Sequence, residues 1–283
     1  MIRPVYRVQN NLMTGNLKSV IAARSRSCTK GVHYLTEPGA AEHQTTLYLS
    51  SRTKEGRIYS DAVVKALPHV QSNHPLRGEW CIRDNSSRRF LGYLAGRSGP
   101  LTLLDVGCGN GWMAARLARL LDCEVCALDL NRTELEQGAK VFNDIPGLTF
   151  VYGNLFEDIL PEECFDIITL AGSIQYFPDV HLLLDRLFPL LAESGEVHII
   201  DSPFYNEKSA PAAKERTRRH YKNLDHPEMA AHYHHHLFSS LDRYNPVLLY
   251  DPRKTIQKIK RKFFDRNLSP FPWVKLEKKR SRC

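Results

Sequence analysis

Short apolar runs alternate with helical patterns through the central part of the chain. Residues 101–106 form one such run, and apolar or small residues then recur at three- and four-residue spacing from Met113 to Leu121. This alternation predicts strands that are each followed by a helix, as in a parallel α/β sheet. Further strands are expected at 124–128, 148–152, 164–171, 196–200, 245–250 and 271–276, and helices at 133–142 and 180–191.

The N-terminal third of the chain lacks this regularity. Residues 1–41 are rich in Arg, Ser and Asn without sustained periodicity, so we expect a mobile extension with a short helix near 17–23. The helical patterns that follow predict a helical segment over 42–99, which would cover a ligand bound to the sheet. The remaining residues, 100–283, are expected to form the main domain.

Two segments of the C-terminal half stand apart from the βα pattern. Residues 204–245 form a connection that is long, helical in pattern and rich in histidine, which is typical of a substrate lid. Residues 255–264 predict a basic amphipathic helix, which we expect to cover the sheet with Ile256, Ile259 and Phe263 facing inward. Contact of this helix with an anionic membrane surface or an acidic substrate is the alternative.

Three alternate glycines, Gly107, Gly109 and Gly111, follow the first strand. Glycine permits positive φ and close approach of a ligand to the backbone, and the first amides of the next helix point outward as donors. The dinucleotide-binding pattern G-x-G-x-x-G needs a glycine where Trp112 stands, so the turn is only weak evidence for a nicotinamide cofactor. Asp105 ends a buried strand, where an acid is costly unless it meets a donor such as the amine of a ligand.

The segment Asp105-Val-Gly-Cys-Gly-Asn-Gly111 resembles motif I of the class I S-adenosylmethionine-dependent methyltransferases, and residues 80–202 follow that family's order. The resemblance is to small-molecule enzymes with a methyltransferase type 11-like domain. It implies an α/β fold: a Rossmann-like, seven-stranded, mostly parallel sheet with helices on both faces and a helical insertion after strand 5. It also implies S-adenosyl-L-methionine as cofactor, and the residues expected to bind it are Asp105, Gly107, Cys108, Gly109, Gly111, Asp129, Leu130, Asn154, Leu155, Ala171 and Arg83.

The family's order also implies roles for single residues. Asp129, at the tip of the second strand, is expected to accept both ribose hydroxyls, which it could equally do for a nicotinamide cofactor. Asn154 stands where the family usually has an acid for the adenine amine, and its amide oxygen can still accept a weaker bond. Arg83 and Trp80 are candidates for the methionine carboxylate. The alternative is a solvated Arg83 and a core-packed Trp80.

The acceptor site is expected to use His232, His235 and His236 of the lid, together with Tyr176 after the fourth strand. A hydroxyl acceptor needs a general base, for which histidine is suited, whereas an amine need only arrive deprotonated. On a helix His232 and His236 would share one face at a spacing that can bind zinc. No nearby cysteine or H-E-x-x-H pattern supports such a site, so we expect no metal.

Charge changes the picture of possible partners. The net charge is +8, but residues 1–41 carry +5 and residues 252–283 carry +10, which leaves −7 for the centre. This distribution favours a small-molecule acceptor over nucleic acid, with RNA methylation through the basic C-terminal segment as the alternative. A non-catalytic protein that binds S-adenosylmethionine is the other alternative.

The cysteines and the hydropathy bear on location. Seven scattered cysteines, no apolar run of about 18 residues and no signal-peptide pattern favour reduced thiols and a cytoplasmic protein without a transmembrane segment. The oligomeric state and the acceptor are not encoded in any recognisable pattern.

Overall fold

The computed structural model describes residues 6–8, 11–13, 16–39, 42–263 and 265–278. Most of the strands form one mixed sheet in the order β10-β11-β9-β8-β5-β6-β7-β4-β3. These strands are β3 (Ser27–Thr29), β4 (Val32–Tyr34), β5 (Leu101–Val106), β6 (Cys123–Asp129), β7 (Leu148–Tyr152), β8 (Phe165–Ala171), β9 (Leu191–Ile200), β10 (Val247–Tyr250) and β11 (Trp273–Glu277). A separate hairpin pairs β1 (Tyr6–Val8) with β2 (Asn11–Met13).

The seven strands expected from the sequence form the body of this sheet. Strands β7, β6, β5, β8 and β9 pair in parallel, whereas β11 is antiparallel to both β9 and β10. Strand β9 begins at Leu191 rather than at 196, because residues around Ser194 and Gly195 pass through a register shift against β8 instead of ending a helix. The α/β class is therefore confirmed, and the sheet is wider than expected.

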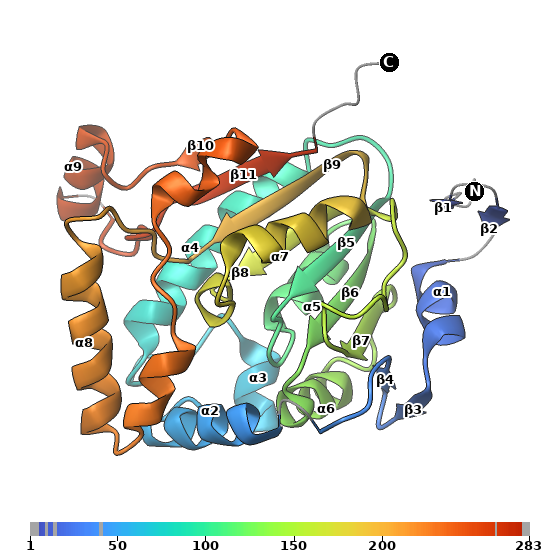
Figure 1. Cartoon of the computed structure of the whole chain (residues 1–283), viewed down its shortest axis with the longest axis horizontal. Helices are drawn as coiled ribbons and strands as arrows, with labels where there is room; N and C mark the ends of the chain where they lie inside the picture. The colour runs from blue at the N-terminus through green and yellow to red at the C-terminus, as the bar shows by residue number, and fades with distance from the viewer. Residues whose placement is uncertain (1–5, 9–10, 14–15, 40–41, 264, 279–283) are drawn as a thin grey trace.

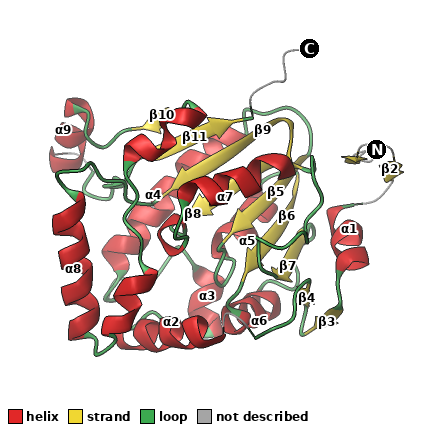
Figure 2. Cartoon of the chain, in the orientation of Figure 1, coloured by secondary structure: helices red, strands yellow, loops and turns green. Residues whose placement is uncertain are grey.

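Helices cover both faces of the sheet (Figure 2). On one face α1 (Leu17–Arg24) and α7 (Val180–Leu187) pack through residues such as Ile21 and Leu184. On the other face α4 (Arg77–Leu94), α5 (Trp112–Leu120) and α6 (Arg132–Val141) pack through residues such as Phe90, Leu117 and Leu135. All six residues of β5 are buried because both of its faces are covered, which explains its continuous apolar run.

The extra strands come from the N-terminal region. Residues 16–39 contain α1 and the hairpin β3–β4, and β4 pairs in parallel with β7 at the edge of the sheet. The backbone N–H of Leu17 also donates to the Glu124 carboxylate on β6 at 2.8 Å. The expectation of a mobile extension is therefore wrong for residues 16–39. The sequence did not reveal these strands because strands of three residues are too short to leave a periodic pattern. Residues 1–5, 9–10, 14–15 and 40–41 lie outside the described residues.

Two further helices precede the central sheet, α2 (Glu42–Lys54) and α3 (Asp61–Ala66). The Ser60 side chain caps α3 by accepting from the Val63 amide, as its position in the sequence suggests. Figure 1 shows α2 beside α3 at one edge of the molecule, at the foot of α8 (Ala210–Asn223). Helix α2 lies at the edge of the sheet at which β5, β6 and β8 end, because its residues Thr45, Tyr48 and Arg52 line the same cavity as the ends of these strands.

The insertion after β9 is only partly helical. Helix α8 is followed by two short 3₁₀ helices, η3 (Pro227–His232) and η4 (Phe238–Tyr244). Between them the backbone is extended and pairs with Tyr205. The Tyr205 amide donates to the His236 carbonyl at 3.0 Å, and the Phe238 amide donates to the Tyr205 carbonyl at 2.8 Å. His232 and His236 therefore do not share a helix face, and the expectation of i, i+4 spacing on one helix is wrong.

The basic helix α9 (Thr255–Phe263) is present but oriented opposite to the prediction. Ile256, Ile259 and Phe263 are 53%, 42% and 68% exposed, whereas Gln257 and Arg261 are half-buried. The pattern of the sequence defined the apolar stripe but not the direction in which it faces. Among the described residues, no helix has both the length and the apolarity to cross a bilayer.

Candidate functional site

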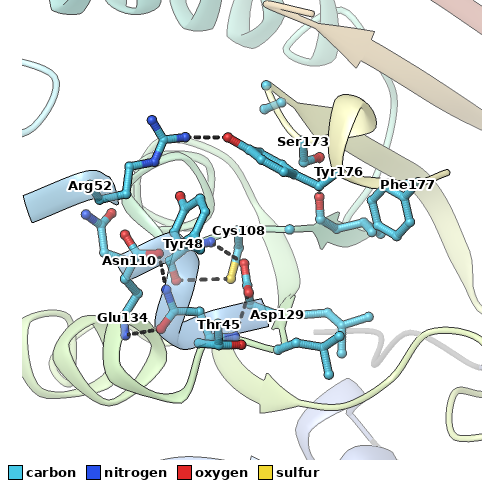
Figure 3. A pocket seen from close by; sticks show the side chains of 18 of the residues that line it. Thr45, Tyr48, Arg52, Cys108, Asn110, Asp129, Glu134, Ser173, Tyr176 and Phe177 are labelled. Carbon is cyan, nitrogen blue, oxygen red and sulfur yellow. Dashed lines mark hydrogen bonds between the residues drawn. The ribbon is translucent and has the colours of Figure 1, made fainter. Parts of the chain in front are cut away.

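A cavity of about 430 Å³ opens at the carboxyl ends of the central strands, which is the usual ligand position in an open α/β sheet. Its volume suits a nucleoside-sized ligand. The glycine turn, the ends of β6, β7 and β8, and helices α2 and α4 form its walls (Figure 3). The sequence-predicted residues that line it are Trp80, Arg83, Gly107, Cys108, Gly109, Asp129, Leu130, Asn154, Leu155, Ala171 and Tyr176.

The glycine turn is held in place by its conformation and by close packing. Gly107 has φ +72°, and a β-carbon there would lie 2.6 Å from Cβ of Ser173. Gly111 has φ +73° at the start of α5, and a β-carbon there would lie 2.4 Å from Cε1 of Phe150. Gly111 is therefore needed for packing against β7 and does not line the cavity, whereas Gly107 and Gly109 present their backbone to it.

Asp129 connects the tip of β6 to this turn. One carboxylate oxygen accepts from the Gly109 amide and the other from the Asn131 amide, both at 2.8 Å. Burial raises the pKa of the Asp129 carboxyl, and the two backbone amides oppose that shift. Each oxygen has a second lone pair, so the carboxylate can hold the turn and still accept hydroxyl groups from a ligand.

Asp105 does not line the cavity, in contrast to the prediction of a direct contact. It is 1% exposed beneath the turn, where its Oδ1 accepts from the Thr169 hydroxyl at 2.7 Å. Its Oδ2 has no hydrogen-bond partner among the described side chains. Burial raises the pKa of Asp105 to about 6, and the hydrogen bond from Thr169 opposes that shift.

The remaining predicted cofactor residues lie in two places along the wall. Asn154 and Leu155 follow β7, and the Asn154 amide oxygen accepts from the Phe156 amide at 3.1 Å, which fixes the turn. Arg83 comes from α4, where it stacks over Trp80 with 5.4 Å from its central guanidinium carbon to the ring centroid. A β-carbon on Gly172 would lie 3.6 Å from an Nη of Arg83, so the guanidinium lies beside the loop after β8.

Tyr176 meets a helix that the sequence analysis did not connect with the site. Its hydroxyl accepts from Nη2 of Arg52 on α2, and its ring packs edge-on against Tyr48, with the centroids 5.6 Å apart. The other Nη of Arg52 donates to Glu55 at 2.6 Å, which holds the guanidinium over the Tyr48 ring. Figure 3 shows that Arg52 and Tyr176 point toward each other on one side of the cavity and that Asp129 and Glu134 lie on the other side.

Glu134 is a second acid of the cavity wall that the sequence analysis missed. It lies in the first turn of α6, where its amide and its carboxylate bond the Asn131 side chain at 3.2 and 2.7 Å. Burial, reinforced by the nearby Asp129, raises the pKa of Glu134 to about 7. Its position is explained by helix capping, but the same carboxylate also borders Gly109.

The three lid histidines do not line the cavity in the described part of the chain. Nε2 of His236 lies 3.1 Å from the Ile174 carbonyl, two residues before Tyr176, and burial lowers its pKa. Nε2 of His235 lies 2.9 Å from the Thr217 hydroxyl on α8. His232 ends η3, away from the wall. Among the described residues no group of three or more potential metal ligands occurs.

The residues that sequence reasoning missed come mainly from α2 and the connection that follows it. Tyr48 and Arg52 are four residues apart on one face of α2, which is the only local sign that they act together. Arg57 and Arg83 both bind Glu79, and against the effect of its burial they lower the pKa of Glu79 to about 2. These contacts join α2 to α4 over the cavity.

The comparisons with known proteins agree with this geometry. Residues 103–195 match a family model described as a methyltransferase domain. An uncharacterized methyltransferase from Mycobacterium bovis is 29% identical over 102 residues, which are 36% of this chain and 51% of that protein. A ubiquinone biosynthesis O-methyltransferase from Rhodopseudomonas palustris is 33% identical over 129 residues, which are 43% of this chain and 48% of that protein. The chain thus spans about half the length of these relatives.

Solved structures share the fold over a larger part of the chain. Geranyl diphosphate C-methyltransferase from Streptomyces coelicolor, in complex with Mg²⁺, geranyl-S-thiolodiphosphate and S-adenosyl-L-homocysteine, has a TM-score of 0.54 at 15% identity, covering 87% of this chain and all of that one. A geranyl diphosphate methyltransferase in complex with S-adenosylmethionine has a TM-score of 0.51 at 14% identity, covering 78% and 94%. The matched methyltransferase domain, the glycine turn and the strand order agree with the resemblance to the class I S-adenosylmethionine-dependent methyltransferases.

Proposed function

We propose that this protein transfers a methyl group from S-adenosylmethionine to a small-molecule acceptor at oxygen or nitrogen. The observation that carries the proposal is the juxtaposition in one cavity of two groups of residues. The glycine turn and Asp129 form one group, and Tyr48, Arg52 and Tyr176 form the other. A cofactor at the first group and an acceptor at the second would be aligned with each other, which is the main requirement of methyl transfer.

The residues present suit the cofactor. Because glycine has no side chain, Gly107 and Gly109 leave room for the cofactor beside the backbone of the turn. The remaining lone pairs of Asp129 can accept the ribose hydroxyls. Arg83 would pair with the methionine carboxylate, while Leu130 and Leu155 would flank the base. When bound, the cofactor supplies the activated methyl group on its sulfonium.

Tyr176 would orient the acceptor. Because Arg52 donates to the phenolic oxygen, the hydrogen of that hydroxyl remains available to an oxygen or nitrogen of the acceptor. His236 would position the loop through the Ile174 carbonyl rather than act on the substrate. The insertion at 204–245 would support α2, since His226 and His220 contact Ser50 and Glu55 at 2.8 and 2.7 Å.

The test is release of S-adenosylhomocysteine by the full chain with S-adenosylmethionine and a panel of small phenols, carboxylic acids and amines. Release that depends on one acceptor class, and that falls at least tenfold in Arg52→Gln, supports the proposal. Binding of the cofactor without turnover on the panel or on a metabolite extract would instead support a non-catalytic binding protein. Release with total RNA that falls steeply with salt would support the RNA alternative.

A further inference from the structure

Helix α9 carries its apolar side chains on the face that points away from the protein. Ile256, Ile259 and Phe263 follow one another at spacings of three and four residues, so they form one stripe along the helix. Their exposed fractions of 53%, 42% and 68% contrast with the half-buried Gln257 and Arg261, which face the body of the protein. A helix that only covered the sheet would have the reverse orientation.

The stripe is a local concentration of exposed apolar residues. Eight large apolar side chains are exposed in the described part of the chain, and three of them, Ile256, Ile259 and Phe263, lie on α9. The other five are spread over residues 58–247. Isolated exposed apolar residues are ordinary, whereas a cluster of them marks a surface that contacts something else.

The charges on the helix itself are all of one sign. Residues 252–263 contain six basic residues and no acid. Among the described residues, Lys254, Lys258, Lys260 and Lys262 form no ion pair, while Arg253 pairs with Asp251. On the helix Lys260 and Lys262 flank the stripe, where long side chains can reach the headgroups of lipids while the apolar residues enter the bilayer.

We propose that α9 docks the protein on an anionic membrane surface, with the stripe Ile256, Ile259 and Phe263 inserted at the level between headgroups and acyl chains. An apolar stripe bordered by unpaired lysines fits a surface that is negatively charged outside and apolar beneath. A second copy of this chain would bring lysines against lysines, which is unfavourable at this face. Figure 1 shows α9 at the margin of the molecule, beyond the end of β10.

The experiment is flotation of the full chain with vesicles of pure phosphatidylcholine and with vesicles that contain about 30% phosphatidylglycerol. A triple variant Ile256→Gln, Ile259→Gln, Phe263→Gln removes the stripe and keeps the lysines. Leu182→Gln is the matched control, because Leu182 is a 62% exposed apolar residue on another helix. Circular dichroism melting checks that the variants, all at exposed positions, fold like the wild type.

The wild type and Leu182→Gln should bind the anionic vesicles at least tenfold more tightly than the neutral ones, and the triple variant should lose at least tenfold on the anionic vesicles. Equal binding to both lipids, no binding, or full binding by the triple variant would each overturn the proposal. A concentration-dependent dimer in sedimentation velocity that the triple variant abolishes would assign the stripe to a second copy instead.

Discussion

Replacing Asp129 with asparagine separates the cofactor role of this residue from its support of the glycine turn. Both carboxylate oxygens accept backbone amides at 2.8 Å, and asparagine keeps only one acceptor oxygen. The lost charge-assisted bond costs about 2 kcal/mol. Because burial raises the pKa of Asp129, removing its charge offsets part of this loss. The unliganded variant should therefore fold, with a melting temperature lowered by no more than about 5 °C.

The affinity for S-adenosylmethionine should fall much more. Loss of the negative acceptor for the ribose hydroxyls removes about 2 to 3 kcal/mol of binding free energy, which is a loss of about 30- to 150-fold. Calorimetric titration at pH 7.5 measures this directly. Asp158→Asn is the control, because the Asp158 side chain is 88% exposed and does not line the cavity. An affinity of Asp129→Asn within threefold of the wild type would refute the reasoning.

Three further substitutions test other parts of the account. Gly107→Ala should lower the free energy of unfolding by about 2 kcal/mol and abolish cofactor binding, because φ is +72° and the new β-carbon would lie 2.6 Å from Ser173. Denaturant melts measure the stability, and Gly92→Ala is the control because Gly92 has open space around it. Tyr176→Phe should leave cofactor affinity within twofold and lower methyl transfer at least tenfold, whereas an unchanged rate would remove Tyr176 from the acceptor site. Glu196 accepts from Tyr93 and His198 at 3.0 and 3.1 Å, and against the effect of its burial these contacts and Arg97 lower its pKa from 4.5 to about 2. Its ionised form therefore stabilises the fold above pH 4.5, by about 3 kcal/mol, and this contribution is lost as the pH falls towards 2. Urea denaturation should show that Glu196→Gln is less stable than the wild type at pH 7 by about that amount and that the difference shrinks at pH 3; a constant difference would contradict the assignment.

The sequence predicted those parts of the molecule whose pattern is local. The strand and glycine turn around Gly107, and the acid at the tip of β6, follow from period and spacing alone, and the structure places Asp129 and Gly107 in the cavity wall. Asp105 shows the limit of that reasoning. Thr169 is the partner that the fold supplies for Oδ1, whereas Oδ2 has no hydrogen-bond partner among the described residues.

Other parts depend on contacts between distant segments. Arg52 reaches Tyr176 across 124 residues of sequence, so no local pattern could show that α2 belongs to the site. His232 and His236 were placed together by assuming a continuous helix, which the pairing of Tyr205 with residues near 236 interrupts. The periodicity of α9 likewise defined a stripe but could not tell whether the protein or its surroundings would cover it.

The central claim is that the cavity beside the glycine turn binds S-adenosylmethionine. The most direct test is calorimetric titration of the full chain with S-adenosylmethionine and, separately, with NADH. The account predicts micromolar binding of S-adenosylmethionine, with one site per chain, and no heat with NADH. Binding of NADH alone, or of neither ligand, would contradict it, because Asp129 and the glycine turn would then serve another cofactor or only the packing of the sheet.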